Sequence, residues 1–345
     1  MHDINFIDLF SGAGGGSKGF VDAGFSAVGA LDNNQDLSKT YFKNISLNPI
    51  ICDINECSGS NILSHFGIDK KEVNVLIGCP PCQGFSSLKK NGLDPRNSLL
   101  LNYARKIKEI LPEFFVFENV SGIVFERNIK FFKKFLTYIK KIGYECRYDI
   151  LNAADYGVPQ VRKRMILIAT RIKEFKMKLE LPEPNYGLKA QYRWRTVGDA
   201  INDLPRLKNG EKSSIPNHNA PNHTPRILDM IKEIPINGGS RTDLPKKFWL
   251  KCHLRHKGHT DVYGRLWWDK PSPTITCGCQ SPSKGRFIHP YQNRGITLRE
   301  SARLQSFSDD FIFYGNRTQC AEQIGNAFPP IFAKAIANKI LEYYN

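Results

Sequence analysis

The chain has 345 residues, long enough for one large domain and a smaller second domain with a sizeable buried core. No apolar run approaches the roughly 18 residues of a membrane span, and the N-terminus lacks a secretory signal, so we expect no membrane partner. Nine irregularly spaced cysteines favour reduced thiols in a cytoplasmic protein over a disulfide framework.

Positive charge is concentrated in one part of the chain. The whole sequence has 49 Lys and Arg against 33 Asp and Glu, and residues 171–296 hold 23 of the basic and 11 of the acidic ones. A basic region of this kind suits a nucleic acid better than a small neutral ligand. A merely soluble basic surface is the alternative.

Apolar and amphipathic runs alternate along the first 170 residues. The apolar runs predict strands at 4–10, 25–32, 48–53, 73–78, 112–119 and 164–170. The amphipathic runs predict a helix through Phe20 and Ala23, after a glycine loop, and further helices at 36–44, 99–111 and 129–143. This alternation predicts an α/β fold with a doubly wound, mostly parallel sheet.

The pattern changes from about residue 172, where prolines, glycines and basic residues become frequent. Helical patterns return only at 296–307 and 329–344. We therefore expect a first domain of residues 1–190, completed by residues 292–345, and a smaller, irregular basic domain of residues 191–291.

A glycine-rich loop follows the first predicted strand in FIDLFSGAGGGSKGF, residues 6–20. A literal G-x-G-x-x-G spans residues 14–19, which is too far from the strand end for a good dinucleotide fingerprint. Asp32 and Asp53 end the next two strands, so loop and acids converge where such sheets bind ligands. The pattern predicts an adenosine-type cofactor without separating a nicotinamide from S-adenosylmethionine, and a purely structural turn is the alternative.

The stretch GCPPCQGFS, residues 78–86, contains Cys79 and Cys82 with two prolines between them. A Cys-x-x-Cys pair suits zinc binding, thiol–disulfide exchange, or one activated thiol with an idle neighbour. The flanking residues alone do not decide among the three.

Six motifs in order along the chain resemble those of the cytosine-5 DNA methyltransferases. They are FIDLFSGAGG, GCPPCQGFS, FENV (117–120), QVRKR (160–164), RGITLRESARLQSF (294–307) and QIGNAFPP (323–330). The resemblance covers residues 4–170 and 263–335. It implies a Rossmann-like methyltransferase fold and an enzyme that uses S-adenosylmethionine to methylate a cytosine flipped out of double-stranded DNA.

The resemblance also assigns catalytic roles. Cys82 is the nucleophile that adds to carbon 6 of cytosine and makes carbon 5 nucleophilic. Glu118 hydrogen-bonds ring nitrogen 3 and the exocyclic amine. Asn119 ties the Cys82 loop to the strand that carries Glu118 and Asn119. Arg164 contacts the cytosine 2-oxygen, and Arg162 braces the site or the nearby backbone.

A cofactor site for S-adenosylmethionine follows from the same resemblance. Phe10 would stack on the adenine, Asp32 would bind the ribose, and Asp53 with Ile54 would bind the adenine edge. Gly12 and Gly14 would let the backbone approach the methionine part, and Asn326 would close over that part. Pro80 is a further expected cofactor-binding residue. Two positions depart from the family pattern: Ala327 replaces a common serine, and Cys79 replaces a small or aromatic residue.

The basic middle, residues 191–291, is then the expected target-recognition domain, with Arg, Lys and tryptophans to contact DNA. The segment after Cys82 resembles the family's loop that closes over DNA. Cysteines and histidines with irregular spacing offer an alternative zinc site, although the family requires no metal; they are Cys252, His253, His256, His259, Cys277 and Cys279.

We expect a monomer of a prokaryotic restriction–modification system, located in the cytoplasm, with a possible cognate endonuclease that forms no stable complex with it. The alternatives are a tRNA cytosine-5 methyltransferase, a non-catalytic DNA-binding homologue, and a thiol–disulfide or zinc protein built on Cys79 and Cys82. The DNA target sequence does not follow from the residues.

Overall fold

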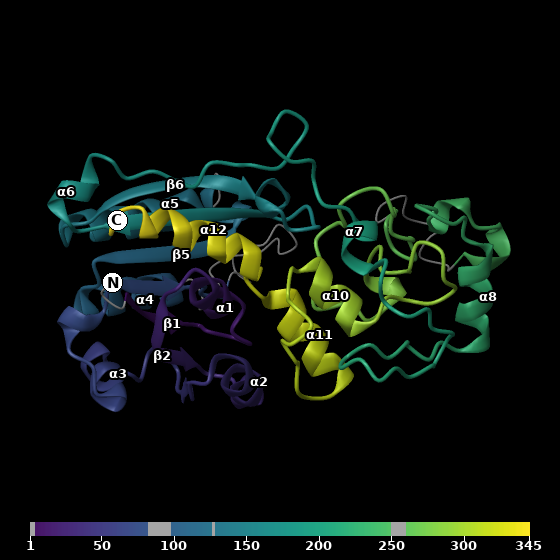
Figure 1. The fold of residues 1–345 in the computed structure, drawn as a ribbon, viewed down its shortest axis with the longest axis horizontal. Coiled ribbons are helices and arrows are strands. Elements are labelled where there is room, and N and C mark those ends of the chain that lie inside the picture. Colours follow the sequence, from purple (N-terminus) through teal and green to yellow (C-terminus); the bar gives the residue numbers. More distant parts are fainter. Residues whose placement is uncertain (1–3, 82–97, 126–127, 250–259) are drawn as a thin grey trace. The chain divides into compact units, whose positions relative to one another are not determined.

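The computed structural model describes residues 4–81, 98–125, 128–249 and 260–345 (Figure 1). The chain divides into two compact units. The first unit comprises residues 1–156, 163–184 and 328–345, and the second comprises residues 157–162 and 185–327. Within the described ranges, no helix is long and apolar enough to cross a membrane.

The first unit is built on a seven-stranded sheet with the order β3-β2-β1-β4-β5-β7-β6. The strands are β1 (Asn5–Leu9), β2 (Ser26–Asp32), β3 (Ile50–Ile51), β4 (Val75–Gly78), β5 (Phe114–Val120), β6 (Glu145–Asn152) and β7 (Lys163–Thr170). Strands β1 to β5 pair in parallel, and β7 is antiparallel to both β5 and β6. The predicted α/β, mostly parallel sheet is confirmed.

Helices cover both faces of this sheet. Those of the first unit are α1 (Gly15–Asp22), α2 (Gln35–Ile45), α3 (Gly59–Phe66), α4 (Ser98–Ile110), α5 (Ile129–Lys141), α6 (Lys173–Lys176) and α12 (Pro330–Leu341), with the 3₁₀ turns η1 (Lys70–Glu72), η3 (Ser121–Val124) and η4 (Ala153–Tyr156). Alternate strand residues such as Ile7 and Leu9 share a buried core with α3, α4 and α5. Phe6 points to the other face, where its ring contacts Phe20 of α1.

Helices α1 and α12 lie side by side and in close contact (Figure 1). A Cβ at Gly19 would stand 2.5 Å from the Cβ of Ala333 and 2.8 Å from the backbone nitrogen of Lys334. The last glycine of the literal G-x-G-x-x-G therefore serves helix packing, because any side chain there would force α1 away from α12.

Strand order reverses at β1, whose neighbours β2 and β4 lead to opposite halves of the sheet. In open α/β sheets the carboxyl ends of the strands at such a switch point form the ligand-binding edge. The glycine loop follows β1 directly, so the fold places it at this edge.

The second unit is mostly irregular. Its helices are α7 (Val197–Ile201), α8 (Pro225–Glu233), α10 (Leu298–Leu304) and α11 (Arg317–Asn326), with the 3₁₀ turns η5 (Arg241–Asp243), η6 (Lys246–Phe248) and η7 (Pro282–Lys284). Buried arginines hold its loops together. Arg265 alone donates to the carbonyls of Ile231, Ile234, His289 and Gln292 and to the Asn293 side chain.

The bounds of this second unit differ from those of the predicted basic domain, residues 191–291. The unit contains residues 157–162, 185–190 and 292–327 in addition to residues 191–291. The division of the chain into catalytic and target-recognition domains is a functional one and stays a prediction.

Candidate active site

The loop after β1 has an unusual backbone conformation. Phe10, Gly12 and Gly14 have φ values of 65°, 56° and 97°, all in the left-handed region that favours glycine. Phe10 adopts it in spite of its side chain, and strain of this kind concentrates at functional sites. Its ring is half-buried, and its edge packs on Tyr103 with ring centroids 6.4 Å apart.

Asp32, at the end of β2, fixes this loop. Its Oδ2 accepts a hydrogen bond of 2.8 Å from the Gly12 backbone N–H, and its Oδ1 accepts one of 2.9 Å from Asn34. Burial raises the pKa of the Asp32 carboxyl above its usual range. The two predicted cofactor residues Gly12 and Asp32 are therefore in direct contact.

A buried polar network lies behind the same loop. The Ser17 hydroxyl, in the first turn of α1, donates to Asp8 Oδ2 at 2.6 Å and shares a hydrogen bond of 2.8 Å with the Tyr41 hydroxyl. Asp8 is 2% exposed, and burial raises its pKa to about 7. Sequence reasoning missed all three residues, although an aspartate within the apolar run FIDLF was the available signal.

The loop fits the predicted nucleoside cofactor. A Cβ at Gly12 would meet no atom within 4 Å, so space opens at this point of the loop. Within the described part of the chain, the buried Ser11 hydroxyl has no hydrogen-bond partner. Residues 10–14 therefore form a glycine cradle. Its open space, the unsatisfied Ser11 hydroxyl and the nearby Asp32 carboxyl offer the hydrogen-bonding groups that a polar ligand requires.

Asp53 and Ile54 follow β3, as predicted. Asp53 Oδ1 accepts a 2.8 Å hydrogen bond from Asn55, and Ile54 is buried. Cys52 and Cys57, on either side of this pair, form a disulfide. The expectation that the cysteines are reduced is wrong for these two, because the turn of residues 53–56 brings the thiols of Cys52 and Cys57 together.

Strands β4 and β5 bring the GCPP and FENV segments together, since Gly78 pairs with Phe117. The Asn119 side chain donates a hydrogen bond of 3.2 Å to the carbonyl oxygen of Pro80, which is buried. Cys79 is a half-buried thiol outside any disulfide. Cys82 and the following residues 83–97 lie outside the described residues, so the structure places only the chain that leads to the nucleophile.

Glu118 and Arg164 form an ion pair on one face of the antiparallel β5–β7 pair. Arg164 Nε lies 3.0 Å from Glu118 Oε1, and the side chains of Arg164 and Glu118 are only 14% and 12% exposed. The register explains the contact: Arg164 is opposite Val120, and Glu118 is two residues along on the same face. A partly buried carboxylate held by a guanidinium is suited to orienting a polar ligand.

Arg162 and Asn326, both in the second unit, are held by backbone and side-chain contacts. The buried Arg162 guanidinium donates to the carbonyls of Ile275, Gly325 and Ala327 at 3.1 to 3.3 Å. Exposed Asn326, which ends α11, accepts a 3.0 Å hydrogen bond from the Cys277 thiol. Arg162 therefore braces backbone, one of the two roles that the sequence predicted for it.

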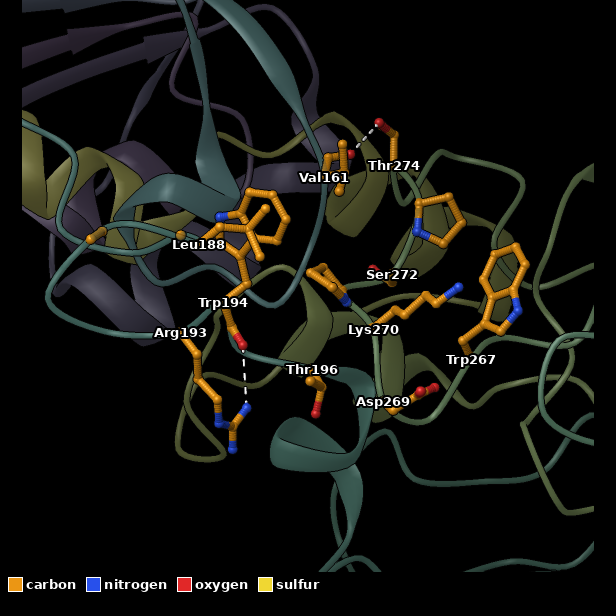
Figure 2. Close-up of a pocket in the computed structure, with 14 residues that line it drawn as sticks. Val161, Leu188, Arg193, Trp194, Thr196, Trp267, Asp269, Lys270, Ser272 and Thr274 are labelled. Atoms are coloured by element: carbon orange, nitrogen blue, oxygen red, sulfur yellow. Dashed lines mark hydrogen bonds between the residues drawn. The ribbon is translucent and has the colours of Figure 1, made fainter.

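The second unit also contains an open pocket of about 1010 Å³. Trp194 and Trp267 lie on opposite sides of it, with Lys270 between them (Figure 2). The Arg286 guanidinium lies 3.9 Å from the Trp267 ring centroid, and the Lys270 ammonium lies 5.1 Å from it. Trp249 and Trp268 have internal roles instead: Trp249 donates to the Leu244 carbonyl, and Trp268 packs on Tyr291.

Residues 252–259 of the alternative zinc site lie outside the described residues. The other two members, Cys277 and Cys279, are inside the described ranges. The Cys277 thiol donates a hydrogen bond to the Asn326 side chain, and burial raises the pKa of the Cys279 thiol to about 11. Among the residues that the structure describes, no group of three or more His, Cys, Asp or Glu side chains could hold a metal ion.

A doubly wound sheet with a glycine cradle at its switch point, and acids at the ends of the flanking strands, defines a nucleoside-cofactor enzyme of the Rossmann-like class. The family model for C-5 cytosine-specific DNA methylases matches residues 4–342, and the chain belongs to this family. It is a DNA (cytosine-5-)-methyltransferase, and this family uses S-adenosylmethionine. The predicted family, enzyme class and cofactor are confirmed.

Similar proteins cover nearly the whole chain. The type II methyltransferase M1.HphI of Haemophilus parahaemolyticus is 38% identical over 98% of this chain and 87% of its own length. The type II methyltransferase M.DdeI of Desulfomicrobium norvegicum is 34% identical over 99% and 89%. A solved structure of a candidate DNA modification methyltransferase from a prophage (E. coli) is 26% identical, covers 99% of this chain and all of its own, and superposes with a TM-score of 0.78.

Proposed function

We propose that this chain methylates carbon 5 of a cytosine within a specific double-stranded DNA sequence, through a covalent adduct with Cys82, as part of a type II restriction–modification system. The observation that supports this most is the grouping of Asn119, Pro80, Glu118 and Arg164 at the adjoining ends of β4, β5 and β7. Pro80 is two residues before Cys82, so this grouping lies where the described chain leads to the proposed nucleophile.

Cys82 supplies the nucleophile. Its thiolate forms a bond to carbon 6 of the flipped cytosine, which raises the electron density on carbon 5. After carbon 5 has been methylated, a base or water removes the proton from carbon 5, and the bond between Cys82 and carbon 6 breaks. The hydrogen bond from Asn119 to the Pro80 carbonyl, two residues before Cys82, holds the start of this segment on β5. Pro80 and Pro81 stiffen it.

Glu118 and Arg164 handle the polar edge of the cytosine ring. Glu118 binds nitrogen 3 and the exocyclic amine, and it shares a proton with the ring as negative charge develops there. Arg164 contacts the 2-oxygen, and its 3.0 Å ion pair keeps the Glu118 carboxylate in one orientation. Arg162 supports the site indirectly through the three backbone carbonyls that it binds.

The glycine loop and the ends of β2 and β3 hold S-adenosylmethionine. Phe10 stacks on the adenine, Asp32 binds the ribose, and Asp53 with Ile54 binds the adenine edge. Gly12, Gly14, Pro80 and Asn326 complete the site. When bound, the cofactor supplies the electrophilic methyl group. The strained Phe10 and the Asp32–Gly12 hydrogen bond support this assignment, because they fix the loop before any ligand enters.

The second unit provides the DNA-binding surface, with residues 191–291 as the target-recognition domain. Its sequence contains 23 Lys and Arg against 12 Asp and Glu, whereas the first unit contains 26 against 21. The pocket between Trp194 and Trp267, with Lys270 between them, offers aromatic and cationic groups that suit DNA. A separate domain of this charge favours DNA over tRNA as the substrate.

The relatives named above are type II methyltransferases, and this chain covers at least 87% of each of the two. We infer that it protects host DNA from a cognate restriction endonuclease. It acts in the cytoplasm as a monomer and forms no stable complex with that nuclease.

A methylation assay tests this proposal. Purified protein with labelled S-adenosylmethionine is offered duplex DNA of broad sequence content and, side by side, bulk tRNA. Label is expected in DNA only, and bisulfite sequencing of DNA from an expressing host should show one modified sequence. Label in tRNA alone would overturn the DNA assignment, and label in neither would overturn the enzymatic one.

A further inference from the structure

Asp8 is the residue at the cofactor loop that the proposed mechanism leaves unused. It lies on β1, two residues before the left-handed Phe10, and its side chain points toward α1. Ser17 Oγ donates to its carboxylate at 2.6 Å, and a Cβ at Gly16 would stand 3.7 Å from Asp8 Oδ2. The carboxylate is therefore buried between β1 and the first turn of α1, the two elements that the glycine cradle connects.

The groups that face Asp8 do not neutralise it. They are Asp32 at the end of β2, Ser17 on α1, Tyr41 on α2 and Tyr103 on α4. Among the residues that the structure describes, no lysine, arginine or histidine forms an ion pair with Asp8. A buried carboxylate without a countercharge is costly, and it is unexpected in a chain with a formal charge of +16.

The two forms of the cofactor differ in charge. S-adenosylmethionine has a sulfonium cation, an ammonium group and a carboxylate, for a net charge of +1. S-adenosylhomocysteine, the product of methyl transfer, has lost the sulfonium charge and is neutral overall. A buried anion beside the cradle attracts the first form more strongly than the second, because the surrounding protein screens charge poorly.

We propose that Asp8 determines the specificity of the loop for S-adenosylmethionine over S-adenosylhomocysteine: its carboxylate is the countercharge of the sulfonium, and it takes up one proton from solvent when the product occupies the loop. This inference rests on the proposed cofactor site. It accounts for the presence of an acid within the buried strand β1, and it gives the enzyme a means to release its product.

The affinity for S-adenosylmethionine should depend on pH. The Asp8 pKa is raised to about 7, so below pH 7 the binding of the cation must release a proton from Asp8. Affinity for S-adenosylmethionine should therefore rise with pH through about 7 and then level off. Affinity for S-adenosylhomocysteine should change little, so the ratio of the two affinities should increase about tenfold from pH 6 to pH 8.

Isothermal titration calorimetry on the full chain tests this without turnover. Both compounds are titrated at pH 6, 7 and 8 in two buffers of different ionisation enthalpy, which counts the protons exchanged. Proton release on binding S-adenosylmethionine near pH 6.5, and none on binding S-adenosylhomocysteine, is expected. Equal proton exchange for the two compounds would overturn the inference.

Two variants sharpen the test. Asp8→Asn keeps the size and the acceptor for Ser17, and it should reduce affinity for S-adenosylmethionine about tenfold while leaving that for S-adenosylhomocysteine unchanged. Ser17→Ala keeps the charge but removes a hydrogen bond that lowers the Asp8 pKa, so the pH midpoint of the affinity ratio should move to higher pH.

The outcomes separate the two proposals. If the wild-type chain binds neither compound, the proposed cofactor site fails. If it binds both but Asp8→Asn weakens them equally, only the charge discrimination fails and Asp8 is structural. An unchanged midpoint in Ser17→Ala would likewise contradict the role of Asp8 as the titrating group.

Discussion

Glu118 and Arg164 show how a single contact between two strands prepares a reactive centre. Each lies near a strand end, and the antiparallel β5–β7 register brings them together on one face. The pairing could not be predicted from the sequence, because 39 residues separate FENV from QVRKR and only the sheet fixes their register. The motifs identified the residues; the fold supplied their distance.

Substitution of Glu118 by Gln tests the assigned role. The change keeps the shape but removes the proton-sharing carboxyl, so we expect the methyl-transfer rate to fall about 10²- to 10⁴-fold. Fluorescence anisotropy should show DNA affinity within a few-fold of wild type. A variant with near wild-type turnover would show that Glu118 only pairs with Arg164.

Burial of Asp8 should also make the free energy of unfolding depend on pH. An unfolded aspartate ionises near its ordinary pKa of 3.8, whereas folded Asp8 ionises at about 7, so the folded state binds the extra proton between these values. Stability should therefore fall as pH rises from 4 to 7. Relative to Asp8→Asn, the wild-type free energy of unfolding should decrease by up to about 4 kcal/mol over this range. Urea unfolding at pH 4, 5.5 and 7 measures it, and a constant difference would contradict the burial of a titrating group.

The glycines of the loop before α1 and the glycines of α1 itself have separate tasks. Gly12 and Gly14 give the loop its left-handed turns, while Gly19 allows α12 to approach. Sequence alone indicated a glycine loop but not this division, because the partner of Gly19 is a helix more than 300 residues away.

Gly19→Ala should destabilise the protein by about 1–3 kcal/mol, since the new methyl group meets Ala333 and the backbone of Lys334. Gly16→Ala is the matched control in the same helix, because its methyl group would find ordinary contacts, the nearest being 3.4 Å from the Phe328 ring. That control should be neutral or slightly stabilising. Equal effects in urea unfolding would show that the α1–α12 contact does not require glycine.

Several elements of the structure could not be predicted from the sequence patterns. Strand β6 is an edge strand with half-buried and exposed positions, so ECRYDILN lacks the apolar run that revealed β1, β4 and β5. Helices α3 and α11 were not predicted either, the first being short and the second only weakly amphipathic. The disulfide between Cys52 and Cys57 depends on a turn that spacing does not reveal.

At the scale of the whole molecule, charge is divided between the two units. Most of the excess of basic residues lies in the second unit, whereas the strands beside the cofactor loop of the first unit contribute two acids, buried Asp8 and half-buried Asp32. This division suits a polyanionic substrate and a cationic methyl donor. The basic segment and Asp32 were evident from the sequence, but buried Asp8 became evident only from the packing around it.

DNA affinity should therefore depend steeply on salt. Between 50 and 200 mM salt we expect the dissociation constant for duplex DNA to rise by more than about tenfold, because each phosphate contact releases counterions. Affinity for S-adenosylmethionine alone should change far less over the same range. Anisotropy and calorimetry at matched salt measure the two, and parallel changes would contradict the assigned division of charge.

In the proposed mechanism one thiol, that of Cys82, attacks a cytosine in DNA. Incubation with S-adenosylmethionine and duplex DNA containing 5-fluorocytosine tests it directly, because the fluorine on carbon 5 blocks release of the enzyme. A denaturant-stable adduct should form with wild type and Cys79→Ser and be absent with Cys82→Ser. An adduct that survives in Cys82→Ser, or that requires both cysteines, would show that Cys82 is not the sole nucleophile.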